Sequence, residues 1–327
     1  GQALHSHYRL EALINVLLPV WIESAANCIF THPNPGKALA APSRINSGTP
    51  EAMPIQNNKR PICITGGAGF LGTHLVRKLL DRGEGELTVV DLREPDAELL
   101  ERVRYCRGSF SDTEVLREAI RDGSVIVHLG GTSNQAMSEK DHQADVDLNI
   151  QGALQLLNVA AEKRVEKFVF ISSAPAVYGP QEHMPIRVDA MPNPISAHGI
   201  MKLAVEQYIR LYARNHSFAY ANLRCVNIYG PGQLADTHGV VSRFASNILS
   251  GIPIELWGSP SVQRDFLFVE DFTEALFRSI QPEVKDVTLN IASGSYTALG
   301  DLIAIIERIT GKAAVVNQRE VRAIDTR

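Results

Sequence analysis

Residues 65–72 read Thr-Gly-Gly-Ala-Gly-Phe-Leu-Gly, and this stretch decides the fold. Its glycines at positions 66, 69 and 72 have the spacing G-x-x-G-x-x-G. The apolar run 62–65 predicts a strand before the turn, and the periodic stretch 71–80 predicts a helix after it. Glycines let the main chain turn tightly and approach a pyrophosphate, and the following helix directs its free N–H groups at that anion. The sequence therefore predicts a dinucleotide phosphate site.

Asp91 closes the second predicted strand, residues 87–90, nineteen positions after Gly72. A carboxylate at this place accepts hydrogen bonds from the adenosine ribose hydroxyls and repels a 2′-phosphate. We therefore expect NAD rather than NADP as the cofactor. The predicted cofactor site comprises Gly66, Gly69, Phe70, Leu71, Gly72 and Asp91.

Strands and helices alternate along the rest of the chain. Further strands are expected at 125–129, 168–172, 219–226 and 287–291, and helices at 152–161, 202–214, 240–250 and 299–310. Such alternation indicates βαβ units, whose parallel strands form one sheet covered by helices on both faces. The predicted fold class is α/β, a doubly wound Rossmann parallel sheet with a smaller substrate-binding lobe.

The chain divides into three expected parts. Residues 1–60 form an N-terminal extension, with a short amphipathic helix within 10–21 and a proline-rich linker from residue 31. That helix is expected to pack on the main body or to make an oligomer contact. Residues 61–186 form the NAD-binding Rossmann domain. Residues 187–327 supply the remainder of the Rossmann sheet and the C-terminal substrate-binding lobe.

Composition argues against several classes of protein. The 327 residues are 45% hydrophobic and 21% charged, as in a folded globular protein, and the net charge of −4 argues against a nucleic-acid partner. Cys28, Cys63, Cys106 and Cys225 are scattered, which argues against a zinc site and a disulfide framework and favours a cytoplasmic location. No metal site is predicted. No apolar run suits a membrane span, and the first residues do not read as a secretory signal.

Several further motifs follow the glycine turn. They are His128-Leu129-Gly130, Asn149-Ile150-Gln151-Gly152, Ser172-Ser173 with Val177-Tyr178-Gly179, Leu223-Arg224 with Asn227-Ile228-Tyr229-Gly230-Pro231-Gly232, Arg264-Asp265-Phe266 with Val269-Glu270-Asp271, and Asn290-Ile291-Ala292-Ser293-Gly294. With these motifs in this order, residues 61–312 resemble the extended short-chain dehydrogenase/reductase family, the group of NAD-dependent nucleotide-sugar epimerases and dehydratases.

The resemblance implies cofactor roles outside the glycine turn. Leu129, Gly130 and Asn149 would complete the NAD site, and Lys202 would hold the cofactor ribose. The resemblance also implies a homodimer formed through paired helices.

The resemblance implies a nucleotide-sugar substrate as well. Asn227 would lie near the sugar diphosphate, and Arg264 would pair with a substrate phosphate, whose geometry suits a guanidinium group. An ion pair of Arg264 with Asp271 or Asp265 is the alternative.

His198 occupies the position of the family's catalytic tyrosine, and Lys202 follows in its usual place. The family uses the lysine to lower the pKa of the tyrosine base, which is ~10 in the free side chain. A neutral imidazole, with a reference pKa of ~6.5, accepts a proton without such tuning, but it is shorter than a phenol. Three interpretations remain open. His198 is a replacement base, the protein binds NAD without catalysis, or another residue such as Tyr178 or His183 has taken over.

The family's Ser/Thr that binds the reacting oxygen is Ser173 by one count and Ala174 by another. Counting forward from the predicted strand gives Ser173, and we favour this count because the register of a strand is harder to shift than the length of a loop. Ala174, Pro175 and Ala176 offer no acid, which favours simple oxidation–reduction over dehydration. The leading hypothesis is an NAD-dependent epimerase or related oxidoreductase that acts on a nucleotide-activated sugar by transient hydride transfer. The rival is a catalytically silent or repurposed NAD-binding protein of the same fold.

Overall fold

The computed structural model describes residues 60–131, 135–235 and 239–320. The helix expected within residues 10–21 and most of the linker expected from residue 31 lie outside the described residues.

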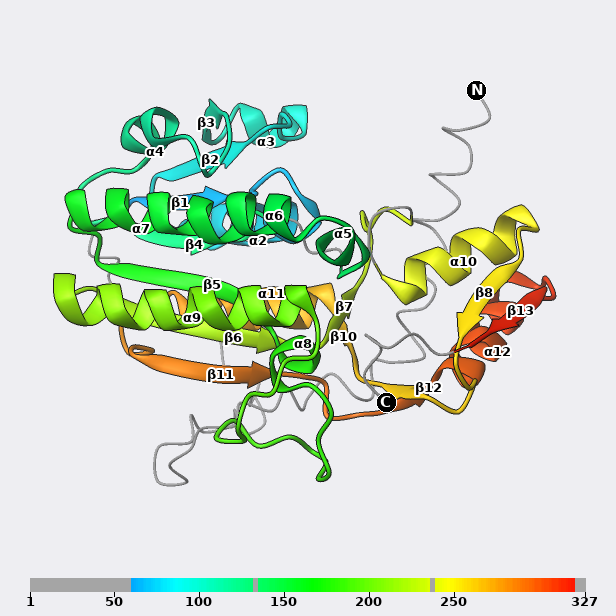
Figure 1. The fold of residues 1–327 in the computed structure, drawn as a ribbon. Helices are drawn as coiled ribbons and strands as arrows, with labels where there is room; N and C mark the ends of the chain where they lie inside the picture. The colour runs from blue at the N-terminus through cyan, green and yellow to red at the C-terminus, as the bar shows by residue number, and fades with distance from the viewer. Residues whose placement is uncertain (1–59, 132–134, 236–238, 321–327) are drawn as a thin grey trace, which may run out of the picture.

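Seven strands form the central sheet (Figure 1). They are β1 (Ile62–Thr65), β2 (Leu87–Asp91), β3 (Arg104–Arg107), β4 (Val125–His128), β5 (Lys167–Ser173), β6 (Ala219–Cys225) and β11 (Val287–Ile291). Their order in the sheet is β11-β6-β5-β4-β1-β2-β3, and every neighbouring pair runs parallel. This arrangement confirms the predicted doubly wound α/β fold.

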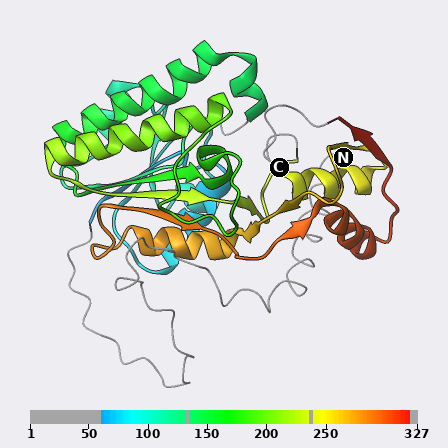
Figure 2. The same cartoon turned by 60° about the horizontal axis from the view of Figure 1, so that its bottom comes forward.

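Helices cover both faces of the sheet, which buries strands β1 and β4 along their whole length. One face carries α2 (Phe70–Asp81), α3 (Ala97–Leu100) and α11 (Val269–Ser279). The other carries α4 (Thr113–Ala119), α7 (Gly152–Glu162) and α9 (Ala197–His216). Figure 2 shows the sheet between α7 and α9 on one side and α11 on the other. Side chains of β1 alternate between the two cores, with Ile62 and Ile64 in one and Cys63 in the other.

The winding direction changes between β1 and β4, which are neighbours in the sheet. In open α/β sheets, ligands bind outside the carboxyl ends of the strands at such a switch point. Short segments cluster in the connections that leave these ends. They are α5 (Gln135–Lys140), α6 (His142–Asp145), the π-helical turn η3 (Val146–Gln151) and α8 (Ala174–Tyr178).

A smaller hydrophobic cluster lies beside the sheet and is built around two helices, α10 (Val240–Ser250) and α12 (Leu299–Thr310). Short paired strands surround them: β7 (Asn227–Tyr229) with β10 (Phe266–Phe268), β8 (Ile254–Trp257) with β13 (Val316–Arg319), and β9 (Gln263–Arg264) with β12 (Thr297–Ala298). Figure 1 shows α10, α12 and the β8–β13 pair as a lobe next to the carboxyl ends of the sheet strands.

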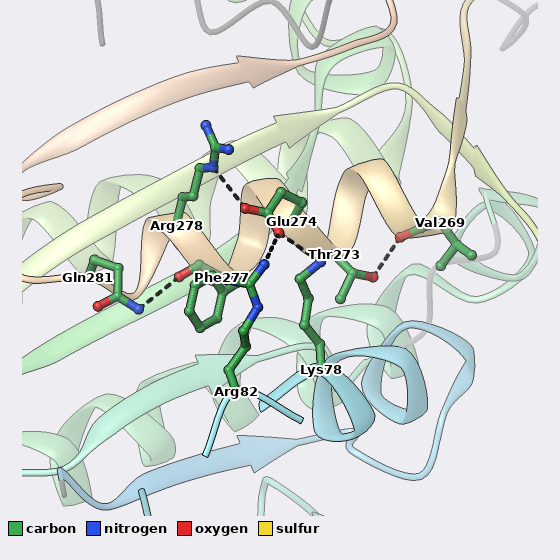
Figure 3. Close-up of polar contacts among 8 residues, drawn as sticks. All are labelled: Lys78, Arg82, Val269, Thr273, Glu274, Phe277, Arg278 and Gln281. Atoms are coloured by element: carbon green, nitrogen blue, oxygen red, sulfur yellow. Dashed lines mark hydrogen bonds and ion pairs between the residues drawn. The ribbon is translucent and has the colours of Figure 1, made fainter. Parts of the chain in front are cut away.

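Glu274 joins the two helices α2 and α11 (Figure 3). Its carboxylate lies 2.7 Å from Nζ of Lys78 on α2, 3.4 Å from Nη2 of Arg82, which caps the C-terminal end of α2, and 3.0 Å from Nε of Arg278 on α11. Burial raises the pKa of Glu274, but the hydrogen bonds from Lys78 and Arg278 outweigh burial, so the net pKa is lowered. Ion pairs therefore attach the C-terminal end of α2 to α11, while the N-terminal end of α2 meets the glycine turn.

Candidate functional site

The glycine turn leaves no room for side chains at two of its positions. Gly66 has φ +74°, and a Cβ there would lie 2.7 Å from the main-chain nitrogen of Gly130. A Cβ on Gly72 would lie 2.4 Å from the oxygen of Gly66. The loops after β1 and β4 and the first turn of α2 therefore touch through their main chains.

Helix α2 begins at this turn without a side-chain cap. Gly69 is its N-cap residue, so Phe70 and Leu71 are its first two helical residues. The first N–H groups of a helix have no partner within the helix and attract anions. The main-chain cradle and the open helix end together fit a pyrophosphate.

Asp91 lies beside the glycine turn at the end of β2. One of its oxygens accepts a hydrogen bond from the main-chain N–H of Ala68 at 3.0 Å, and the other accepts from the N–H of Arg93 at 2.9 Å. These bonds orient the carboxylate next to the turn while it stays partly exposed. The arrangement fits the ribose end of NAD, as the sequence predicts.

Three further predicted cofactor residues lie at or near the end of β4. Leu129 and Gly130 follow the last residue of that strand, and Gly130 touches the glycine turn. Asn149 is buried in η3, and its Nδ2 donates to Asp145 at 2.9 Å. A Cβ on Gly131 would lie 2.6 Å from Oδ1 of Asn149, so this side chain reaches the loop after β4.

His128 is the buried last residue of β4, and its Nδ1 lies 2.7 Å from Oγ1 of Thr65 at the end of β1. Burial, followed by the charge of Lys202, lowers the pKa of His128 to about 3. The ring is therefore neutral, and it joins the ends of the two central strands.

Lys202 lies on α9 above the end of β5. Its Nζ donates to the main-chain oxygen of Ile171 at 2.9 Å and lies 4.7 Å from the ring centre of Phe170. Burial lowers the pKa of Lys202 to about 8, opposed in order by Cys225, Glu206 and Asp145. A cation at this place can interact with the cofactor ribose through its remaining hydrogens.

His198 is the second residue of α9 and lies one helical turn before Lys202, with both side chains on one face. Its side chain is buried, with 7% of the residue exposed. Ser196 caps the helix by accepting a hydrogen bond from the N–H of Gly199 at 3.2 Å. A Cβ on Gly199 would lie 2.1 Å from the oxygen of Ala176, so α8 and α9 touch through their main chains.

The structure places Ser173 at the end of β5 and Ala174 at the start of α8. Strand β5 pairs with β6 without interruption from Lys167 to Ser173, so strand register is regular up to this serine. The preceding residue, Ser172, is buried and donates to Glu206 on α9 at 2.5 Å. The assignment of the oxygen-binding position to Ser173 stays a prediction.

A buried polar network behind Lys202 was not predicted from the sequence. Arg224 of β6 donates from Nε and Nη2 to Glu206, the latter at 2.7 Å, and its guanidinium lies 4.7 Å from the ring centre of Tyr178. The signal in the sequence is an arginine inside the apolar strand 219–225 and a glutamate one turn after Lys202. A buried arginine needs a carboxylate partner.

Tyr178 is fully buried in this network, which bears on its role as an alternative base. Its hydroxyl donates to Oδ1 of Asn290 at 2.8 Å and also lies 3.2 Å from the oxygen of Val188. Burial raises the pKa of Tyr178, although Arg224 lowers it. The phenol therefore holds the loop before α9 against the sheet, which does not suit a base that must meet substrate.

The predicted substrate residues Asn227 and Arg264 lie close together. Asn227 donates from its main-chain N and its Nδ2 to the main-chain oxygen of Asp265, at 3.3 Å and 3.0 Å. The carboxylate of Asp265 accepts from Ser293 and Gly294. The described contact of Arg264 is from Nη1 to the oxygen of Gln263 at 3.0 Å.

His74 links the cofactor helix to the loop after β7. Its Nε2 lies 2.9 Å from the main-chain oxygen of Pro231, and because a carbonyl can only accept, Nε2 donates. Burial lowers the pKa of His74, opposed by this hydrogen bond. The loop that follows strand β7, on which Asn227 lies, is thereby connected to α2.

Within the described ranges, no group of three or more His, Cys, Asp and Glu residues is arranged to hold a metal ion. Among the same residues, no helix is long and apolar enough to cross a membrane.

The parallel sheet, the glycine turn and Asp91 define a dinucleotide-binding Rossmann protein. Residues 62–292 match the model of the NAD dependent epimerase/dehydratase family. Because this match covers more than half of the chain, the protein belongs to that family. The predicted family, with its use of NAD, is thus confirmed.

Similar proteins share the same fold and family. A putative UDP-glucose 4-epimerase of Methanocaldococcus jannaschii is 30% identical over 254 residues, which are 76% of this chain and 82% of that protein. The UDP-glucose 4-epimerase of Thermotoga maritima, solved with UDP-glucose, is 31% identical with a TM-score of 0.76, covering 82% of this chain and 88% of that one. The Thermus thermophilus UDP-glucose 4-epimerase, solved with NAD, is 29% identical with a TM-score of 0.74, covering 81% and 88%.

Proposed function

We propose that the protein is an NAD-dependent 4-epimerase of a nucleotide-activated sugar, with His198 as the base. The observation that carries this proposal is the position of Lys202. It lies one helical turn after His198 on α9, and its Nζ donates a hydrogen bond to the main-chain oxygen of Ile171 on β5. A base and a cation on one face of α9, at the carboxyl edge of the sheet, suit proton removal beside a bound dinucleotide.

Bound NAD supplies the acceptor, and later the donor, of a hydride. His198 takes the proton of the sugar hydroxyl and later returns it, so the enzyme is unchanged after one cycle. Ser173 donates a hydrogen bond to the reacting oxygen, and Lys202 holds the cofactor ribose. Ala174, Pro175 and Ala176 bring no acid to the site, which supports epimerisation over elimination of water.

The proposed substrate is a sugar linked to uridine diphosphate. The similar Thermotoga enzyme was solved with UDP-glucose, which supports this class. In the present chain, Asn227 lies on β7, which pairs with β10, and Arg264 lies on β9, which pairs with β12; there they would face the diphosphate. A guanidinium group suits a phosphate oxygen pair.

We also infer a homodimer through α9. This helix buries one face against the sheet, yet its opposite face exposes Ile200, Tyr208 and Leu211, with 56%, 38% and 39% of each residue accessible. These positions recur at helical spacing, so they form an apolar stripe that a second α9 would cover. A cytoplasmic location is inferred from the buried free thiols of Cys63, Cys106 and Cys225.

Single-turnover reduction of enzyme-bound NAD by UDP-glucose, followed by nicotinamide absorbance, tests the proposal. We expect reduction by the wild type and loss of reduction in His198→Ala, with NAD affinity retained in both. Tight NAD binding without reduction by UDP-glucose, UDP-galactose or UDP-glucuronic acid would instead support the rival, a silent NAD-binding protein. The match to the epimerase/dehydratase family model and the 30% identity to a putative UDP-glucose 4-epimerase support the enzyme.

A further inference from the structure

Glu139 connects helix α5 to the start of α9. Its Oε1 accepts a hydrogen bond from the main-chain N–H of Ala197 at 2.7 Å. Ala197 is the first residue of α9 and the direct neighbour of His198. The glutamate side chain is partly buried, with 27% exposed, so its position is defined by packing as well as by this bond.

Two features of α9 disfavour a positive charge on the ring of His198. The ring lies at the N-terminal end of α9, where the helix dipole is positive, and Lys202 lies one turn further on. A tyrosine base cycles between neutral and negative forms, which such an environment supports. A histidine base cycles between neutral and positive forms, so it needs a negative charge that a tyrosine base does not.

We propose that Glu139 is a positioning residue whose carboxylate, fixed on the first N–H of α9, stabilises the protonated imidazole of His198. This inference rests on the proposed role of His198. In the step concerned, the substrate O–H bond breaks and an N–H bond forms on the ring, while the carbon that bears this oxygen loses its C–H bond and forms C=O; bound NAD would accept the hydride. When the hydride returns, the proton returns to the oxygen, and Glu139 keeps its charge throughout.

Other charged and titratable groups lie on elements packed against α9. They include Lys202 and Glu206 on α9 itself, His142 and Asp145 on α6, Tyr178 on α8, and Arg224 and Cys225 on β6. Two carboxylates among these have partners elsewhere: Glu206 is bonded to Arg224, and Asp145 accepts from Ser138 and Asn149.

Glu139 differs from those two carboxylates because its bond is to the main chain beside His198. Its second oxygen lies 3.5 Å from Nε2 of His142, which is largely exposed. Protonation of His142 would weaken the field of Glu139, so its titration is followed as well.

The test replaces Glu139 by glutamine, which keeps the shape and removes the charge. Histidine NMR titrations of the NAD-loaded protein give the midpoint for His198, whose signal is identified by its absence in His198→Ala. We expect Glu139→Gln to move this midpoint, and the acidic limb of turnover with UDP-glucose, to lower pH by roughly 0.5–1 unit. Ser196→Ala, which disturbs the helix start without a change of charge, and Asp301→Asn, which removes a carboxylate from the first turn of α12, should leave the midpoint in place.

A second arm uses the His198→Tyr background. A nearby carboxylate disfavours a phenolate, so Glu139→Gln should raise turnover at neutral pH there, whereas it should lower turnover in the wild type. Effects of the same sign in both backgrounds, or an unmoved His198 midpoint, would overturn the role of Glu139 while leaving His198 as the base. Turnover that survives in His198→Ala would overturn His198 as the base, and the role of Glu139 with it, whereas NAD binding without reduction by any of the UDP-sugars would overturn the proposed function itself.

Discussion

Nζ of Lys202 is hydrogen bonded to the main-chain oxygen of Ile171 at 2.9 Å, which ties helix α9 to the last residues of strand β5. Helix and strand each deliver a predicted catalytic group to the carboxyl edge of the sheet, His198 from α9 and Ser173 from β5. The bond therefore sets the distance between the two elements that the chemistry needs together.

Lys202 should give turnover a basic limb, because burial lowers its pKa to about 8. The charge that holds the ribose is lost as pH rises through this value. Lys202→Arg, which stays charged, should move the limb to higher pH, whereas Lys202→Met should abolish turnover throughout. Turnover that stays level well above pH 8 in the wild type would contradict this assignment.

The same group should make stability depend on pH with a defined sign. The folded-state pKa of about 8 lies below the ordinary value of 10.5, so the unfolded chain binds more protons between these values. The free energy of unfolding should therefore rise with pH across this window. Urea denaturation of Lys202→Met should show a smaller slope, since Lys167, whose pKa burial also lowers to about 8, still contributes, and Lys285→Met, which removes an exposed lysine, should retain the full slope.

Exchanging His198 for tyrosine should not improve turnover with UDP-glucose if imidazole is the natural base. The phenol has an ordinary pKa of ~10 and would need Lys202 to ionise near neutral pH. We expect turnover at or below that of the wild type in a coupled assay. A gain of ~tenfold or more would mean that the chain has lost a catalytic tyrosine and the activity that depended on it, which would support the rival, a silent NAD-binding protein.

Gly72→Ala should disrupt the cofactor cradle. The new Cβ would lie 2.4 Å from the oxygen of Gly66 and 2.5 Å from Cα of Gly67, so the turn must shift. We expect NAD affinity, measured by calorimetry, to fall by ~tenfold or more. Gly300→Ala in α12 is the matched control, because its Cβ would meet Pro260 at 3.2 Å, away from the turn, and should leave affinity within about twofold.

Asp91→Asn should change the preference between the two nicotinamide dinucleotides. The amide oxygen can still accept from Ala68, but the charge that repels a 2′-phosphate is gone. The ratio of NADP to NAD affinity should rise by ~tenfold or more. Asp96→Asn, which removes an exposed partner of Arg77, should leave the ratio unchanged; an equal rise in both variants would indicate a general charge effect.

Glu274→Gln should lower stability without a change in NAD affinity. The carboxylate joins Lys78, Arg82 and Arg278, and its pKa is lowered in the folded protein (Figure 3). Its contribution, about 1 kcal/mol for a partly exposed network, is present above the ordinary carboxyl pKa and is lost as pH falls through the folded value. Denaturation curves near pH 7 and near pH 3 should differ less for the variant than for the wild type.

The sheet was predictable because its central strands are continuous apolar runs, and the segments between them have apolar residues at helical spacing. Strand β3 was not predicted, since Arg104 and Arg107 flank its buried Cys106 at the edge of the sheet. Helix α9 begins at Ala197, five residues before the predicted start, because Ser196 caps it and Gly199 packs on α8. Tertiary contacts set these element limits, and the hydrophobic periodicity of the sequence carries no information about such contacts.

The positions of the glycine turn and of Asp91 were predictable from local spacing, because they lie in one turn and at the end of the next strand. The contacts of Glu139 with Ala197 and of Arg224 with Glu206 join segments 58 and 18 residues apart. A sequence pattern gives no sign that such segments meet. A charged residue within an apolar run of sequence, such as Arg224 in residues 219–225, is the nearest available signal.

The contact at Gly199 assigns the spacing of α8 and α9 to one residue, and the residue beside it, His198, carries the proposed base. Any side chain at position 199 would push α8 and α9 apart, so the spacing of the helices is set by bare main chain. The side chain at position 198 takes no part in this main-chain contact. Tyrosine and histidine codons differ by a single base, so one point mutation can exchange phenol for imidazole in a frame that keeps the lysine where it was.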